Sequence, residues 1–262
     1  MVLPLTIIFF ALGAIIGSFL NVVIYRLNTQ KFLFKSLGGR SACLSCRSIL
    51  FWYELIPLLS FFSLRGRCRT CKTKISIQYP LVELVTGIVF ASLFLKLQDI
   101  LFVSMLKFSI TYAYYAVAFS LLLVIAVYDL RHKIIPDMLA FVFGTLAFFG
   151  LFFFHVPTVL DFLSGVFIAL PFALFWLISA GRWMGLGDAK LALGIGWLLG
   201  VSLALSGLAL AFWSGAIVGV TLILCRNSKM AGRGMKSEIP FAPFLVFGAF
   251  LAFIFNLNLF GI

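Results

Sequence analysis

The sequence predicts an all-α membrane protein, a bundle of transmembrane helices with a small cytoplasmic loop domain. Of its 262 residues, 63% are hydrophobic and only 11% are charged, whereas a soluble domain has about half and about a quarter. The mean hydropathy is +1.18. Several apolar runs approach the ~20 residues that a helix needs to cross the hydrocarbon of a bilayer. These observations exclude an ordinary water-soluble domain.

The apolar runs predict about eight transmembrane helices, in the order in which the runs occur. They cover residues 3–25, 80–97, 106–128, 138–155, 159–179, 189–205, 208–225 and 240–260. Helices are expected because the runs lack the alternation of polar and apolar residues that a membrane strand shows. The first run has no basic segment before it and no clear cleavage motif after it. We therefore interpret it as a retained helix and not as a cleaved signal peptide.

Basic residues predict how the helices are oriented. Placing the loop of residues 27–79 in the cytoplasm also places the loops after the third, fifth and seventh helices there. Of the 20 Lys and Arg residues, 18 then lie on the cytoplasmic side, as the positive-inside rule requires. The net charge of +12 is therefore explained by membrane topology, and no nucleic-acid partner is expected.

Two aspartates stand at the ends of apolar runs. Asp129 closes one run, and Asp188 follows Gly185-Leu-Gly187 and opens another. Two predicted helices separate the aspartates, so both lie at the cytoplasmic edge. A carboxylate at the edge of a span is a functional candidate by default, and two that share a proton form an acid/base pair. Helix capping by each Asp is the alternative, but their matched depth favours the pair.

The two glycines before Asp188 suggest an unusual backbone. Glycine adopts conformations that are closed to other residues and lets a second backbone come close. We therefore expect Gly185 and Gly187 to shape the chain at Asp188 and to let an extended substrate lie against it.

The cytoplasmic loop contains four cysteines in a C-x2-C-x21-C-x2-C pattern. They are Cys43, Cys46, Cys68 and Cys71. This spacing is typical of a structural zinc site. Two disulfides or four free thiols are the alternatives, and a reducing cytoplasm disfavours disulfides. The predicted domains are thus a first transmembrane helix (1–26), a cytoplasmic zinc-binding loop (27–79) and a transmembrane core (80–262).

Six motifs, in order along nearly the whole chain, resemble those of the bifunctional type IV prepilin peptidases, which are membrane aspartic proteases with a G-x-G-D motif. The motifs are Gly17–Arg26, Leu64-Arg-Gly-Arg-Cys68 with the paired cysteines, Tyr79–Thr86, Asp129 with Ile135-Pro136-Asp137, Gly185–Lys190 and Ile239–Pro243. In the last of these, Ala242 stands where the family usually has glycine. One such motif would be weak evidence, but six in the family's order are specific.

The resemblance implies an enzyme of the bacterial inner membrane with its active site on the cytoplasmic face. It would cleave the leader of a type IV prepilin or a type II secretion pseudopilin after a glycine. It would then methylate the new N-terminal amine with S-adenosylmethionine. Asp129 and Asp188 match the family's catalytic pair, and Gly66 matches the position associated with methyl transfer. Its expected partners are these substrates and membrane lipid.

Two alternative functions remain open from the sequence alone. One is a peptidase without methyl transfer, similar to the archaeal preflagellin peptidases, which the intact cysteine loop argues against. The other is a non-catalytic membrane scaffold with a zinc ribbon, which the matched aspartates argue against. The sequence also does not assign the acid and the base, because a coupled pair titrates as a unit.

Overall fold

The structure is a computed structural model that describes residues 2–27, 41–43, 45–154, 157–182, 184–226 and 239–261. The chain divides into two compact units, Met1–Ser120 and Leu121–Ile262. Helices account for most of the described residues, and the only β-structure among them is two isolated bridges, both in the cysteine loop. The predicted all-α fold is confirmed.

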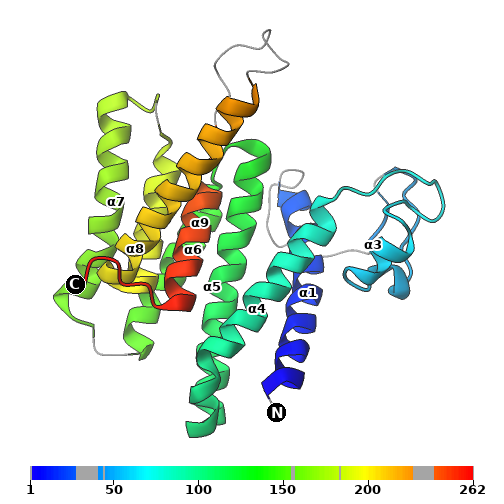
Figure 1. Cartoon of the computed structure of the whole chain (residues 1–262), viewed down its shortest axis with the longest axis horizontal. Coiled ribbons are helices and arrows are strands. Elements are labelled where there is room, and N and C mark those ends of the chain that lie inside the picture. The colour runs from blue at the N-terminus through cyan, green and yellow to red at the C-terminus, as the bar shows by residue number, and fades with distance from the viewer. Residues whose placement is uncertain are drawn as a thin grey trace. The chain divides into compact units, whose positions relative to one another are not determined.

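The first unit is built around two long helices. Its elements are α1 (Val2–Leu27), the 3-10 helix η1 (Trp52–Leu55), α3 (Leu59–Ser63), α4 (Gln78–Val103) and the first part of α5 (Met105–His132). Helix α1 packs along α4, as Figure 1 shows. A Cβ atom on Gly17 would lie 2.8 Å from the Cα atom of Glu83. The small residue lets the two helices approach closely, as is usual inside membranes.

The second unit is organised around one long helix. It contains the end of α5, then α6 (Asp137–Phe154), α7 (Val159–Ser179), α8 (Leu186–Arg226) and α9 (Ala242–Phe255). Helix α8 packs against α6, α7 and α9, and Figure 1 shows it running diagonally between α7 and α9. Glycines again lie where two helix backbones come close together. A Cβ atom on Gly196 would lie 2.6 Å from the Cα atom of Gly165 on α7.

Helix α8 contains two of the predicted transmembrane runs, but its helical backbone is interrupted at a different residue from the one expected. We expected the boundary at residues 206–207, whereas the non-helical residue is Gly200, with φ 76° and ψ 171°. Ser206 and Gly207 are instead used for packing. The Ser206 hydroxyl accepts a hydrogen bond from the Leu259 N–H at 3.0 Å, and a Cβ atom on Gly207 would lie 3.1 Å from the Cα atom of Ala249. Counted on either side of Gly200, the described residues agree with about eight helical segments.

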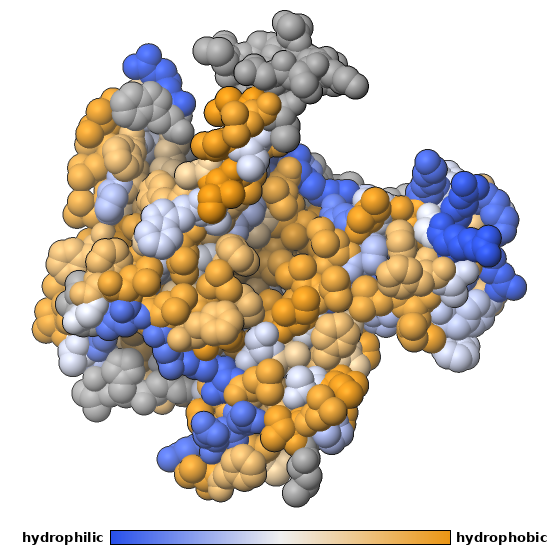
Figure 2. All heavy atoms as spheres, viewed as in Figure 1, coloured by the Kyte–Doolittle hydropathy of each residue, from blue (hydrophilic) through white to orange (hydrophobic). Residues whose placement is uncertain are grey.

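The apolar surface of the helices is that of a multi-pass membrane protein. Five described helices, α1, α4, α5, α7 and α8, are long and apolar enough to cross a membrane, and α6 and α9 are shorter apolar helices. Figure 2 shows apolar atoms over most of the visible helix surface. Hydrophilic atoms gather near helix ends and over the segment that carries α3. Large apolar side chains that would be costly to expose to water can face lipid here.

Substituting Gly248 should destabilise the second unit. A Cβ atom there would lie 2.1 Å from the carbonyl oxygen of Gly207, so Gly248→Leu should cost at least about 1–3 kcal/mol by overpacking the α8–α9 contact. Gly219→Leu is the matched control, because no atom lies within 4 Å of its added Cβ. Thermal melting in detergent, followed by size-exclusion chromatography, compares the two variants. Equal melting temperatures would contradict the close approach of α8 and α9.

Candidate active site and metal centre

Asp129 lies in the last turn of α5 with its side chain almost fully buried. Its residue exposure is 5%. The Oδ2 atom accepts a hydrogen bond from the backbone N–H of Ala242 at 3.3 Å, and Ala242 is the first residue of α9. The N-terminus of a helix carries a partial positive charge. The start of α9 therefore provides a donor and a favourable field for the Asp129 carboxylate.

Asp188 lies in the first turn of α8 and is half-buried. Its N–H donates to the carbonyl oxygen of Gly185 at 3.3 Å. The carboxylate is close enough to Asp129 for their charges to interact. The structure thus brings together two carboxylates that are far apart in sequence. One is buried and the other borders the exposed residues Gly185 and Leu186, an arrangement that suits proton sharing next to a substrate.

The glycines before Asp188 act differently from the expectation. Neither Gly185 nor Gly187 has a positive φ, so the prediction of a backbone closed to other residues is wrong here. Gly187 is needed for space, because a Cβ atom on it would lie 2.8 Å from the Cβ of Ile135. The start of α8 can therefore approach the segment just after α5, which brings Asp188 towards Asp129. Gly185 has no such contact closer than 3.9 Å and is exposed.

Asp137, the other aspartate of the first motif, is engaged elsewhere. It is the first residue of α6, and its Oδ1 atom pairs with Nζ of Lys190 at 2.6 Å. The two side chains are 77% and 41% exposed. This ion pair joins the start of α6 to α8, two residues beyond Asp188. No sequence signal identified Lys190 as its partner, because the pairing depends on how α6 and α8 pack.

The four predicted metal ligands converge. The Sγ atoms of Cys43, Cys46, Cys68 and Cys71 all lie within 4.8 Å of one another, and none forms a disulfide. Zinc–sulfur bonds of about 2.3 Å would place the sulfurs of a tetrahedral site about 3.8 Å apart. The Cys43 and Cys71 sulfurs are separated by 3.8 Å. The four cysteines are therefore positioned to bind a metal ion.

Two matching turns hold the cysteines. The Cys43 N–H donates to the Ser48 carbonyl, and the Arg47 N–H donates back to the Cys43 carbonyl, each at 2.9 Å. The second turn repeats this around Cys68, with the Thr73 carbonyl at 2.9 Å and the Lys72 N–H at 3.0 Å. Arg47 and Lys72 both adopt a positive φ, 57° and 59°. The same pair of backbone hydrogen bonds therefore forms around Cys43 and around Cys68.

Local hydrogen bonds favour the thiolate form at two of the four cysteines. Hydrogen bonds from the Thr73 hydroxyl and N–H lower the pKa of Cys71 to about 6, and Ser48 lowers the pKa of Cys46 in the same way. The pKa of Cys43 is raised to about 11: backbone N–H groups of Cys46 and Ser45 favour its thiolate, but burial and the neighbouring thiols outweigh them. A divalent metal bound at this site would stabilise the thiolate form of all four, because its ligands bind deprotonated.

Gly66 occupies a turn that only glycine fits well. Its φ is +63°, and a Cβ atom would lie 3.0 Å from the ring of Phe61. The Gly66 N–H donates to the Phe61 carbonyl at 2.9 Å, and its own carbonyl accepts from the Ile75 N–H at 2.8 Å. The turn is therefore tied to α3, which carries Phe61, and to the segment leading into α4.

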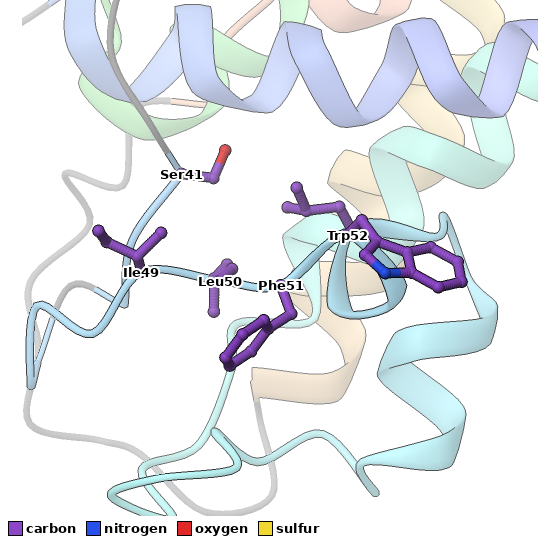
Figure 3. A pocket seen from close by; sticks show the side chains of 6 residues that line it. Ser41, Ile49, Leu50, Phe51 and Trp52 are labelled. Atoms are coloured by element: carbon purple, nitrogen blue, oxygen red, sulfur yellow. The ribbon is translucent and has the colours of Figure 1, made fainter.

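A surface cavity of about 620 Å³ also lies in this loop. Its lining residues are Ser41, Ile49, Leu50, Phe51, Trp52 and Leu55. Figure 3 shows Ser41 and Leu50 on neighbouring segments, with the rings of Phe51 and Trp52 projecting in different directions. The lining is mostly apolar, so the cavity suits an apolar or aromatic group better than a charged one.

Two protein families match the sequence. The bacterial peptidase A24 N-terminal domain matches residues 11–97, and the type IV leader peptidase family matches residues 116–220. No solved structure matches the chain.

Among curated proteins, the chain is similar to several prepilin leader peptidase/N-methyltransferases. That of Bacillus subtilis (strain 168) is 32% identical over 95% of this chain and 94% of its own length. That of Aeromonas hydrophila is 30% identical over 94% and 89%. That of Myxococcus xanthus (strain DK1622) is 37% identical over 84% of this chain, which spans 64% of that relative.

The apolar helices are those of a membrane protein, and the comparisons give its class. The chain belongs to the type IV leader peptidase family. The prediction of an aspartic endopeptidase of the prepilin peptidase class with N-methyltransferase activity is confirmed. A peptidase without methyl transfer and a non-catalytic scaffold are not favoured, because the relatives carry both activities in their names.

Enlarging Gly187 should separate the two carboxylates. In Gly187→Ala the added methyl would lie 2.8 Å from the Ile135 Cβ, so the start of α8 must move. A displacement of about 1 Å can lower catalysis on the order of a hundredfold, and a loss of this size is expected in a leader-cleavage assay. Gly185→Ala is the steric control and should leave thermal stability unchanged. Wild-type cleavage by Gly187→Ala would refute this role of the glycine.

Proposed function

We propose that this protein removes the leader from type IV prepilins or type II secretion pseudopilins, with Asp129 and Asp188 as the catalytic pair, and then methylates the new N-terminus. The observation that carries the proposal is the interaction of the two carboxylates, which the fold brings together from separate helices. The names of the relatives support the choice of substrate.

Hydrolysis needs one proton removed and one proton delivered. The ionised aspartate takes a proton from a water molecule, whose oxygen attacks the carbonyl carbon of the scissile peptide bond. The protonated aspartate donates its proton as the bond to the leaving amine breaks. The products are a leader carboxylate and a pilin with a free N-terminal amine. The exposed Gly185-Leu186 segment beside Asp188 gives an extended substrate access to the pair.

Methyl transfer is assigned to the loop of residues 27–79, and cleavage to the core of residues 80–262. S-adenosylmethionine supplies the methyl group to the amine that cleavage releases. Gly66 is assigned to this activity because it matches the position that the family motif associates with methyl transfer. Its positive φ of +63° and its contact with Phe61 support a turn with a fixed shape, in which a larger residue would be strained.

The metal in the cysteine loop is proposed to be structural zinc. Four thiolates and no other ligand type form a closed tetrahedral site. Among the described residues 41–79, Cys68 is the only buried one, so this loop has almost no hydrophobic core. Binding energy from the metal must then replace the missing core.

The active site is proposed to face the cytoplasm at the bacterial inner membrane, in contact with lipid. This rests on the distribution of Lys and Arg, of which 18 of 20 fall on one side of the predicted topology. A reducing cytoplasm also suits a loop whose four cysteines are free of disulfides.

Replacing a metal ligand should release the metal and loosen the loop. Purified wild-type protein is expected to carry about one zinc per chain, measured by elemental analysis. Cys43→Ser and Cys71→Ser should each lose it and become sensitive to proteolysis within residues 41–77. Cys225→Ser, which changes a cysteine outside the cluster, should retain the metal. A wild-type protein without metal, whose four loop thiols react freely with an alkylating agent, would disprove the site.

Neutralising either catalytic carboxylate should abolish cleavage. Asp129→Asn and Asp188→Asn each leave no complete acid/base couple, so each should lose nearly all peptidase activity. The double variant should be little worse, because members of a catalytic unit are not additive. Cleavage of a prepilin is measured by gel shift in membranes with matched expression levels.

Asp137→Asn is the matched control. It removes the same charge within the same motif but breaks only the exposed pair with Lys190, which is worth at most about 1 kcal/mol. It should therefore cleave as the wild type does. Full activity in Asp188→Asn would refute the mechanism. Loss in Asp137→Asn with activity retained in Asp129→Asn would move the first catalytic carboxylate to Asp137.

A further inference from the structure

A third carboxylate is buried in the first unit and takes no part in hydrolysis as derived above. Glu83 lies on α4 with a residue exposure of 7%. Its Oε2 atom accepts a hydrogen bond from the backbone N–H of Leu58 at 2.8 Å, and the Ser18 side chain on α1 also bonds to it. An acidic residue within a membrane helix is costly to bury and is usually functional. Glu83 connects three segments: α1, α4 and the loop before α3.

The position of Glu83 is fixed by its surroundings. Asn21, which is fully buried, donates from Nδ2 to the Tyr79 carbonyl at 3.1 Å and so ties α1 to α4 one turn away. A Cβ atom on Gly17 would lie 2.8 Å from the Glu83 Cα, so the two backbones are already in contact there. The carboxylate is thus presented to the loop from a rigid pair of helices.

The group that Glu83 holds lies in an unusual turn. Leu58 has φ 60° and ψ −52°, and the Leu59 N–H donates to the Pro57 carbonyl at 2.6 Å. Non-glycine residues rarely adopt this conformation, and it persists only where the surrounding structure fixes it. Besides these local bonds, the bond to Glu83 ties the Leu58 turn to α4.

The Leu58 turn leads directly to Gly66. Helix α3 begins at the next residue, Leu59, and carries Phe61. The Phe61 carbonyl accepts the Gly66 N–H at 2.9 Å, and its ring lies where a Gly66 side chain would be. A continuous set of contacts therefore runs from the Glu83 carboxylate through Leu58 and α3 to the Gly66 turn.

We propose that Glu83 is a positioning residue for N-methyl transfer, which anchors α3 and the Gly66 turn to the helix pair α1–α4. This rests on the proposed role of the Gly66 loop in methyl transfer. Glu83 acts through Leu58 and does not contact the substrate, because it is buried and its Oε2 atom is already bonded. Its loss should impair methylation and leave leader cleavage, which depends on Asp129 and Asp188, largely intact.

The test compares Glu83→Ala with Glu83→Gln in the full-length protein. A prepilin and S-adenosylmethionine are supplied, and mass spectrometry measures both the cleaved fraction and the methylated share of the cleaved product. Glu83→Ala should lower methylation by about tenfold or more while cleavage stays within about twofold of wild type. Glu83→Gln should keep most of the methylation, because its amide oxygen can accept the same N–H. Asp99→Ala, an exposed carboxylate on the same helix, is the control and should change neither activity.

Hydrogen exchange gives a readout that does not depend on activity. The amides of residues 57–66 should exchange faster in Glu83→Ala than in the wild type, with Glu83→Gln in between, because the Leu58 N–H loses its acceptor. Unchanged exchange in Glu83→Ala would overturn the proposal. So would equal loss of methylation in Glu83→Gln and Glu83→Ala, which indicates a requirement for the charge itself. A wild-type protein that cleaves but never methylates would instead refute the proposed function, whereas the exchange result would still test the anchor.

Discussion

The second unit depends on the approach of the start of α8 to the end of α5. Gly187 leaves space for Ile135 at this point, and Asp188, the next residue, then comes within electrostatic reach of Asp129. The first residue of α9 completes the arrangement by donating its N–H to Asp129. Three helix ends thus meet around two carboxylates. Two like charges in such a place favour a shared proton, as the proposed acid/base hydrolysis requires.

The helices and the cysteine loop are held by different interactions. In the helices, small residues let backbones touch, as at Gly207 and Gly248, because lipid provides no hydrophobic force to drive helices together. In the cysteine loop, backbone turns repeat around Cys43 and Cys68, and the metal is the expected source of stability. Glu83 links the helices to the loop. This buried carboxylate on the α1–α4 helix pair holds a loop that has almost no hydrophobic core of its own.

This division also suits two successive reactions on one substrate. Leader cleavage needs carboxylates whose separation is fixed by helix packing, and the product amine is then the acceptor for methyl transfer. The cysteine loop, with its candidate metal site and its hydrogen bond to Glu83, could then be altered without disturbing α5, α8 and α9. We therefore expect variants of the first unit to separate methylation from cleavage, and variants at the Asp129–Asp188 pair to stop both, because methylation needs the cleaved amine.

The sequence by itself determined the all-helical membrane fold, the cysteine cluster and the position of the two aspartates at one edge of the bundle. Each of the three follows from local composition, from residue spacing or from counting membrane crossings, so none of them needs knowledge of packing. The four cysteines converge because their spacing permits two identical turns. Asp129 and Asp188 meet because an even number of helices returns the chain to the same face.

Only the tertiary structure decided which groups touch these residues. The break in α8 lies at Gly200 and not at Ser206-Gly207, because hydropathy cannot distinguish a kink from a helix contact. Gly187 proved necessary for space and not for an unusual φ, since the atom that excludes a side chain belongs to Ile135. Asp129 accepts a hydrogen bond from the backbone N–H of Ala242, and Glu83 accepts one from the backbone N–H of Leu58. Every residue except proline carries such a group, so sequence gives no sign of which one packing will bring to a carboxylate.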